Sequence, residues 1–388
     1  VITMYRGGQY KLYRFRRWTE TKLVFVPETQ AASFGGDPDN FTYPRHDLDM
    51  SLLRVYEDGQ PVRPEHYYRW SANGSREGEL LFVVGNPGNT SRLQTIAQLE
   101  YLRDVQYPAT LFSLNSQIAI LLQMARESPE RAAALRNNVF YLQNSQKAYL
   151  GYQSGVQDSR LLDRKRAWER DFRGRVAANP ELRRQYGAAW DNIARITREQ
   201  AALDARRRFY NFNTLGSRLM SYAGQLTRLP VESPKPDTAR LPAYRDANRA
   251  NLERNINSPA PLDTTLEIRL LTAWFGEMAR ALPATDPVRR QALGTRSPED
   301  AARAMVAANQ LGTADQRRAL LQGGATAVAA STDPFVRLAR VIDPLSRPIL
   351  TRVTALANEE SQNDELVARA LLAVFGNSVA PDATFSLR

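Results

Sequence analysis

Asp49 is the residue of this chain whose type and position could do chemistry, because it stands directly before the apolar run of residues 50–56, which predicts a buried strand. A shielded carboxylate at the mouth of a strand can orient a histidine and stabilise its imidazolium form, as the aspartate of a serine-peptidase triad does. Asp47 would share its face of an extended chain and is an equal candidate on chemistry alone. An aspartate that caps a strand or a turn is the alternative, and the local pattern alone favours it.

Cofactor chemistry is not indicated by the composition. The chain has no cysteine and two histidines, which leaves few ligands for a thiolate or histidine metal site. It also lacks a glycine-rich nucleotide loop, a His-Glu-x-x-His motif and a calcium-binding loop. We therefore expect neither a metal nor a cofactor.

Strand patterns fill the first part of the chain. Residues 22–27, 50–56 and 80–85 are short apolar runs, and residues 13–16 alternate between aromatic side chains and arginine. Short runs of this kind, separated by Gly, Pro and Asp, are typical of a β-barrel or sandwich. No helical period precedes about residue 94.

Helical periodicity begins there and continues for most of the chain. Residues Leu161, Trp168, Phe172 and Val176, for example, lie on one face of a helix. We predict a helix over residues 94–126 that is broken near Pro108, and another that begins near residue 180. Further helices are predicted over residues 129–149, 263–281, 298–310, 314–322 and 344–374. A loop is predicted over residues 229–237.

The charge pattern bears on possible partners. The net charge is +11, mostly from arginine, but in the densest basic segment, residues 160–208, acidic residues are interleaved with the arginines. That mixture favours ion pairs along helices over a phosphate-binding stripe. We therefore expect no nucleic-acid partner. We also expect no membrane insertion, since no run approaches the roughly 18 apolar residues of a membrane span.

The order of the elements predicts the domain organisation. A β segment over residues 1–93 is followed by a helical block over 94–376 and a return to strand character over 377–388. This order predicts an α+β protein in which a helical domain is inserted into a β domain. Because residues 383–388 alternate as if within a strand, we interpret the chain as an internal fragment that lacks both ends.

A rarer pattern precedes Asp49. It consists of Gly35-Gly36-Asp37, Asp39-Asn40, Phe41 and Tyr43-Pro44-Arg45. With this pattern, extended by residues 7–10, 17–19 and 85–92, the first hundred residues resemble the bacterial serine dipeptidyl-peptidase family, typified by dipeptidyl aminopeptidase BII and dipeptidyl-peptidases 7 and 11. The resemblance implies a chymotrypsin-like double β-barrel, partial in this chain, with a large inserted α-helical cap domain.

The resemblance also implies roles for site residues. Asp49 would be the triad aspartate, and Phe41, at a position that often carries tryptophan, would help to enclose the amino end of the substrate. Asn144, in an Asn-x-x-Lys pattern before Gly151, would bind the free α-amino group, with Asn40 assisting. Without the resemblance, Asn144 is better interpreted as an exposed helix residue.

The same resemblance places the other triad members outside this chain, the histidine before residue 1 and the serine after residue 388. His46 follows the motif but is not at the triad position, and His66 lies in a turn-like segment, so we interpret both as structural. Ser378 follows a Gly-Asn pair, but Val379 stands where chymotrypsin-type peptidases have a glycine. We expect the chain alone to be inactive.

We therefore expect the parent protein, of which this chain is a part, to be a serine exopeptidase. It would release dipeptides from peptides with a free N-terminus. A helical cap that closes the cleft and pairs with the substrate ammonium would make the free N-terminus the recognised group. The resemblance further implies a homodimer in the periplasm or at the cell surface of a Gram-negative bacterium. The alternative from another class is a non-catalytic pseudo-peptidase or binding scaffold, whose basic helical domain holds an anionic partner.

Overall fold

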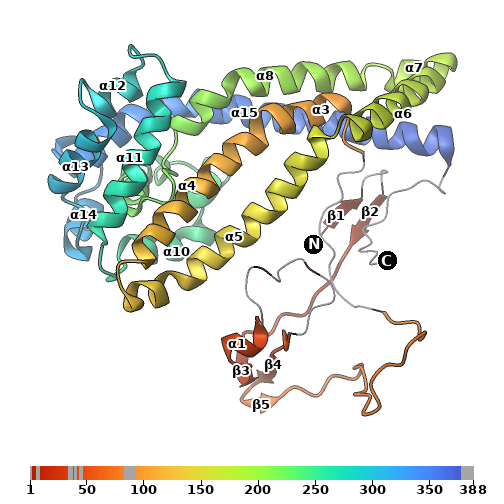
Figure 1. Cartoon of the computed structure of the whole chain (residues 1–388), viewed down its shortest axis with the longest axis horizontal. Helices are drawn as coiled ribbons and strands as arrows, with labels where there is room; N and C mark the ends of the chain where they lie inside the picture. Colours follow the sequence, from red (N-terminus) through yellow and green to blue (C-terminus); the bar gives the residue numbers. More distant parts are fainter. Residues whose placement is uncertain are drawn as a thin grey trace. The chain divides into compact units, whose positions relative to one another are not determined.

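The computed structural model describes residues 2–5, 9–33, 38, 42, 47–82 and 93–376. These residues are mostly helical, with two small antiparallel sheets (Figure 1). The chain divides into two compact units. The first comprises Val1–Gln94, Phe172–Gly187 and Asp364–Arg388, and the second comprises Thr95–Asp171 and Ala188–Asn363.

The strands belong to the first unit. In chain order they are β1 (Ile2–Tyr5), β2 (Gln9–Leu12), β3 (Glu20–Phe25), β4 (Leu52–Glu57) and β5 (Gln60–Pro61), with the single helical turn α1 (Thr29–Ala32) after β3. β1 pairs with β2, and β4 lies between β3 and β5 in the second sheet. Asp58 and Gly59 join β4 to β5 with positive φ values of 51° and 73°, as a type I′ hairpin turn requires.

The strand predicted after Asp49 is confirmed, but it begins at Leu52 and not at residue 50. Where β4 pairs with β3, Leu53 lies opposite Leu23. These two leucines are 61% and 62% exposed. The expectation of a buried strand is therefore wrong for the described part of the chain, which leaves this pair of strands open to solvent.

Two other strand predictions are wrong for the described residues. Residues 13–16 and 80–82 have no regular secondary structure, and residues 83–85 lie outside the described residues. Alternating apolar and polar residues indicate a strand with one buried and one solvent-exposed face. A strand also needs a neighbouring strand to complete its hydrogen bonds. Tyr13 instead stacks on Phe15, with ring centroids 6.1 Å apart.

Helices form the rest of the described chain. They are α3 (Ile96–Tyr101), the π-helical segment η1 (Leu102–Gln106), α4 (Tyr107–Ala125), α5 (Pro129–Gln157), α6 (Ser159–Ala178), α7 (Pro180–Tyr186), α8 (Ala189–Phe209), α9 (Arg218–Glu232), the short 3₁₀ turns η2 (Asp237–Ala239) and η3 (Pro242–Tyr244), α10 (Asp246–Ile256), α11 (Thr264–Ala281), α12 (Pro287–Leu293), α13 (Pro298–Ala307), α14 (Ala314–Ala330) and α15 (Pro334–Phe375).

The predicted helices agree well with α4, α5, α11 and α13, although α5 continues to Gln157. α10 and α12 were not predicted, because their short and mostly polar sequences carry no clear apolar stripe. The predicted loop over residues 229–237 is wrong at its start, since α9 continues through Pro230 to Glu232. α15 begins at Pro334, ten residues before the predicted start, and contains two prolines within one helix.

The predicted break near Pro108 takes the form of a π-helical turn. In η1 the backbone N–H of Tyr107 donates to the carbonyl of Leu102, five residues earlier. Proline has no N–H, and its ring clashes with the carbonyl four residues before it in a regular helix. A wider turn just ahead of Pro108 lets the chain continue into α4 without ending the helix.

The core of the second unit lies among α9, α11, α13 and α15. Phe209, Leu219, Phe275 and Phe335 are fully buried in it. α4 packs against α5 and α11, and Figure 1 shows α4 and α5 running side by side along their length. This pair of helices carries Asn144 and is the part of the unit that matters most for the candidate site.

The expected ion pairs along helices are confirmed among the described residues. Arg184 pairs with Glu181 at 2.6 Å within α7. Arg166 pairs with Asp163 at 2.9 Å within α6. Much of the arginine charge is thus compensated locally, as the interleaved sequence predicts.

Replacing Gly224 of α9 by alanine should destabilise the second unit by about 1–3 kcal/mol. A Cβ at this position would lie 2.2 Å from Cγ of Phe212, so the ring must move. The matched control is Gly276→Ala in α11, where a Cβ meets nothing within 4 Å and better helix propensity should add about 0.5–1 kcal/mol. Urea unfolding measures both, and equal stabilisation by the two changes would contradict the packing at Gly224.

Candidate functional site

Asp49 lies in an irregular segment just before β4. The N–H of Leu48 donates to the carbonyl of Ala31 at 2.9 Å, which ties this segment to the end of α1. The side chain of Asp49 is exposed, whereas that of Asp47 is half-buried. Asp49 is therefore an exposed residue on a backbone that is anchored on both sides, at α1 and at β4.

Several predicted site residues cannot be placed beside it. Phe41 and Asn40 lie outside the described residues, as do His46 and Ser378. His66 is described, and its side chain is exposed in an irregular segment. The proposed contacts of Phe41 and Asn40 with a substrate remain predictions.

Asn144 lies in the middle of α5 and is half-buried, which differs from the exposed position expected without the resemblance. Lys147 and Gly151 follow at i+3 and i+7 and so share its face of the helix. A Cβ at Gly151 would meet no atom within 4 Å. This face of α5 thus combines an amide, an ammonium and open space.

Two side-chain hydrogen bonds fix α5 close to Asn144. Nε2 of Gln146 donates to Oδ1 of Asn115 in α4 at 2.6 Å. Nε2 of Gln153 donates to the carbonyl of Arg103 in η1 at 3.1 Å. Because these bonds lie within nine residues of Asn144, they fix the rotation of α5 about its own axis and so the direction of the Asn144 side chain.

A cluster of three tyrosines, one from the start of α4 and two from α5, was not predicted from the sequence. The ring centroid of Tyr107 lies 5.7 Å from that of Tyr149 and 6.0 Å from that of Tyr152. Burial raises the pKa of Tyr107, and its two tyrosine neighbours raise it further, so its phenol stays protonated at neutral pH. The spacing of Tyr149 and Tyr152 on one helix was a visible signal, but nothing in the sequence paired them with Tyr107.

Neither a metal-ligand cluster nor a membrane span is found among the described residues. No group of three or more His, Asp or Glu side chains there could hold a metal ion. In the same part of the chain, no helix is both long enough and apolar enough to cross a membrane.

Comparison with known proteins adds a family match to this geometry. The family model described as Peptidase S46 matches residues 1–388 of the chain. An Asp/Glu-specific dipeptidyl-peptidase of Shewanella putrefaciens is 27% identical over 355 residues, which cover 87% of this chain and 48% of that protein. A dipeptidyl-peptidase 7 of Porphyromonas endodontalis is 29% identical over 192 residues, 46% of this chain and 23% of that protein.

Solved structures show the same fold. A crystal structure of Porphyromonas endodontalis DPP11 in complex with the dipeptide Arg-Asp matches with a TM-score of 0.72 and 19% identity, over 98% of this chain and 56% of that one. The complex with Arg-Glu matches with a TM-score of 0.70. The chain thus spans about half the length of the relatives that it resembles.

Proposed function

The chain belongs to the peptidase S46 family, and from that premise we propose that the protein containing it is a serine-type dipeptidyl-peptidase acting on peptides with a free N-terminus. The observation that carries this proposal is the family match over all of residues 1–388. The names of the relatives support it, since both proteins compared above are dipeptidyl-peptidases. Hydrolysis of fluorogenic dipeptide amides by the full-length protein is the direct assay, and absence of any hydrolysis would contradict the proposal.

Asp49 is the residue that we propose for the triad. In such a triad the aspartate accepts a hydrogen bond from the histidine, fixes its tautomer and stabilises the imidazolium that forms when serine loses its proton. The position of Asp49 just before β4 supports this role, because Asp49 is an exposed residue next to a strand that fixes its backbone. The anchored backbone between α1 and β4 would hold the carboxylate at a constant position.

A chymotrypsin-like double barrel is the proposed setting for Asp49. Leu23, Leu53 and neighbouring apolar residues of β3 and β4 are exposed in the described chain. Exposed apolar surface of this extent calls for a covering layer, and further strands of a barrel would supply it. The proposed domains are residues 1–93 and 377–388 for the barrel and 94–376 for the helical cap.

Binding of the substrate amino end is the role proposed for Asn144, with Phe41 and Asn40. The amide oxygen of Asn144 can accept a hydrogen bond from an α-ammonium group, and an aromatic wall at Phe41 would exclude water from that contact. A buried site built for this charge rejects a blocked terminus, since its polar groups would then lack partners. The half-buried position of Asn144 on a fixed helix supports the role.

Replacing Asn144 by alanine should lower kcat/KM for free-amino substrates about 10- to 100-fold, the usual effect of losing a hydrogen bond to a charged group. Asn137→Ala on the same helix is the matched control, because its side chain is exposed, and it should leave kcat/KM unchanged. Steady-state kinetics with one dipeptide substrate measures both. Equal values for the Asn144 variant and the wild type would rule out the proposed contact.

The family resemblance also supports a homodimer in the periplasm or at the cell surface. Light scattering of the full-length protein measures its mass in solution, and a monomeric mass at working concentration would contradict the dimer.

A further inference from the structure

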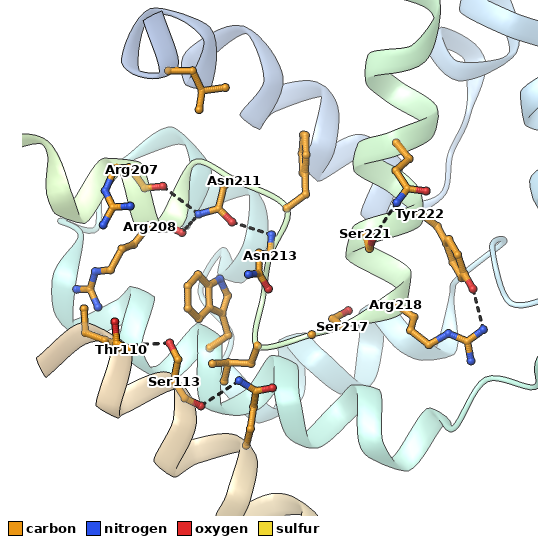
Figure 2. Close-up of a pocket in the computed structure, with 18 of the residues that line it drawn as sticks. Thr110, Ser113, Arg207, Arg208, Asn211, Asn213, Ser217, Arg218, Ser221 and Tyr222 are labelled. Atoms are coloured by element: carbon orange, nitrogen blue, oxygen red, sulfur yellow. Dashed lines mark hydrogen bonds between the residues drawn. The ribbon is translucent and has the colours of Figure 1, made fainter. Parts of the chain in front are cut away.

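A pocket of about 870 Å³ lies in the second unit, against α4, the end of α8 and the start of α9 (Figure 2). Four arginines line it, namely Arg207, Arg208, Arg218 and Arg228, and its described lining contains no aspartate or glutamate. Many of the other lining residues carry amide or hydroxyl groups. The size suits a small molecule, and the charge of the lining favours an anion.

The charge is least compensated at Arg207 and Arg208, which end α8. Asp204 lies 2.8 Å from Arg207 and 3.0 Å from Arg208, so two guanidinium groups share one close carboxylate. Glu277 is 3.9 Å from Arg208 but only 2.6 Å from Arg280. A positive charge therefore remains at this wall of the pocket. Figure 2 shows these two arginines on one side and Arg218 with Tyr222 on the other.

One buried donor at the pocket, Nε1 of Trp274, has no hydrogen-bond acceptor among the described residues. Trp274 is only 4% exposed and lines the pocket. Buried donors are nearly always satisfied in folded proteins, and an unsatisfied one is unfavourable. An acceptor that reaches this donor would therefore be favourable.

The loop between α8 and α9 is held rigidly along the pocket. Nδ2 of Asn211 donates to the carbonyls of Arg207 and Arg208, and its Oδ1 accepts from the N–H of Asn213 at 2.7 Å. Leu215 has a φ of 51°, a strained value for leucine, and its side chain is buried. Strain of this kind persists where packing enforces it, often at binding sites.

We propose that this pocket is a binding site for a small organic anion, whose carboxylate or phosphate group pairs with Arg207 and Arg208. Charge-assisted bonds from guanidinium groups suit either acid. The amides and hydroxyls of the lining then hold the polar body of the ligand. Arg218 and Arg228 are already engaged by Tyr222 and Asp343, at 2.7 and 2.8 Å, and shape the opposite walls. The proposal does not depend on peptidase activity.

Calorimetric titration of the full-length protein with succinate and with inorganic phosphate, at constant ionic strength, tests this site. At least one of the two should bind saturably, and the tighter one identifies the acidic group. Arg208→Gln should weaken binding about 10- to 100-fold. Arg207→Gln should also weaken binding at least threefold. Because the Arg207 side chain is 40% exposed, this substitution should leave the folded structure intact. Arg206→Gln is the matched control, since Arg206 is exposed and does not line the pocket.

The expected pattern is unchanged binding in the Arg206 variant and weakened binding in the Arg207 and Arg208 variants, with circular dichroism showing intact helices. Failure of both anions to bind the folded wild type would overturn the proposal. Equal weakening of anion binding by Arg206→Gln and Arg207→Gln would also overturn the proposal, because that result would indicate general attraction of anions to a basic surface.

Discussion

Asp49→Asn should lower kcat for dipeptide release by the full-length protein about 10⁴-fold, the loss typical when a triad aspartate becomes an amide. Asparagine has nearly the same shape, but its NH₂ group cannot accept the hydrogen bond that the histidine N–H donates. The histidine would then adopt the wrong tautomer and could not take the serine proton. Steady-state rates on a fluorogenic dipeptide amide measure the effect, and KM should change little because Asp49 is not proposed to contact the substrate.

Asp47→Asn is the matched control for this change. Asp47 is two residues away and half-buried, and on chemistry alone it is an equal candidate for the triad. Its variant should keep a kcat within a few-fold of the wild type. A wild-type rate in the Asp49 variant, together with a large loss in the Asp47 variant, would move the triad role to Asp47.

Glu232→Gln should lower the free energy of unfolding by about 3 kcal/mol at pH 7, as expected when one partner of a buried ion pair is removed. Glu232 ends α9 and its side chain is fully buried. Its carboxylate lies 2.6 Å from Lys235 and 2.7 Å from Arg347, and it accepts the N–H of Leu241 at 2.8 Å. The glutamine loses the charge that these three donors surround.

The effect should depend on pH. Burial by itself raises the pKa of Glu232, but the bonds from Lys235, Arg347 and the Leu241 N–H outweigh it and bring the pKa down to about 2. A carboxyl whose pKa is lower in the folded protein adds stability above its unfolded pKa and loses it as the pH falls toward the folded pKa. The difference between wild type and variant should therefore be full above about pH 5 and shrink between pH 4.5 and pH 2.

Urea unfolding at a series of pH values measures this difference. Glu299→Gln is the matched control, since Glu299 pairs with Arg303 at the surface, where both side chains are more than half exposed. Surface pairs contribute about 0–1 kcal/mol, so this variant should be nearly neutral at all pH values. A Glu232 variant whose stability differs from the wild type by a constant amount across the pH range would contradict the depressed pKa.

Some helices could be predicted closely because their signals are local. At α11, Asp263 accepts the N–H of Leu266 at 3.0 Å as the N-cap, and apolar residues then recur at helical spacing. α5 was predicted only to residue 149, because its later part is polar and its order comes from bonds to α4 and η1 that lie far away in the sequence. β4 was predicted from its apolar run, yet its exposure could not be, since burial depends on what covers the strand.

For the candidate site, too, local sequence patterns predict the positions of single residues but not the contacts between distant ones. The position of Asp49 before a strand and the placement of Asn144 on a helix follow from local pattern. The tyrosine cluster needs Tyr107 of α4 to meet two tyrosines of α5, and the arginine pocket needs α8 to meet Trp274 of α11. Contacts of this kind join residues 40 to 70 positions apart, so neither periodicity nor spacing in the sequence indicates them.

Release of dipeptides from a free N-terminus is tested most directly by giving the full-length protein one decapeptide in two forms, with a free and with an acetylated amino terminus. Mass spectrometry of the products should show successive loss of dipeptides from the free form and no cleavage of the acetylated form. Equal cleavage of both forms, or cleavage at internal bonds, would contradict recognition of the amino terminus. No cleavage of either form would contradict the peptidase function and favour a non-catalytic binding protein.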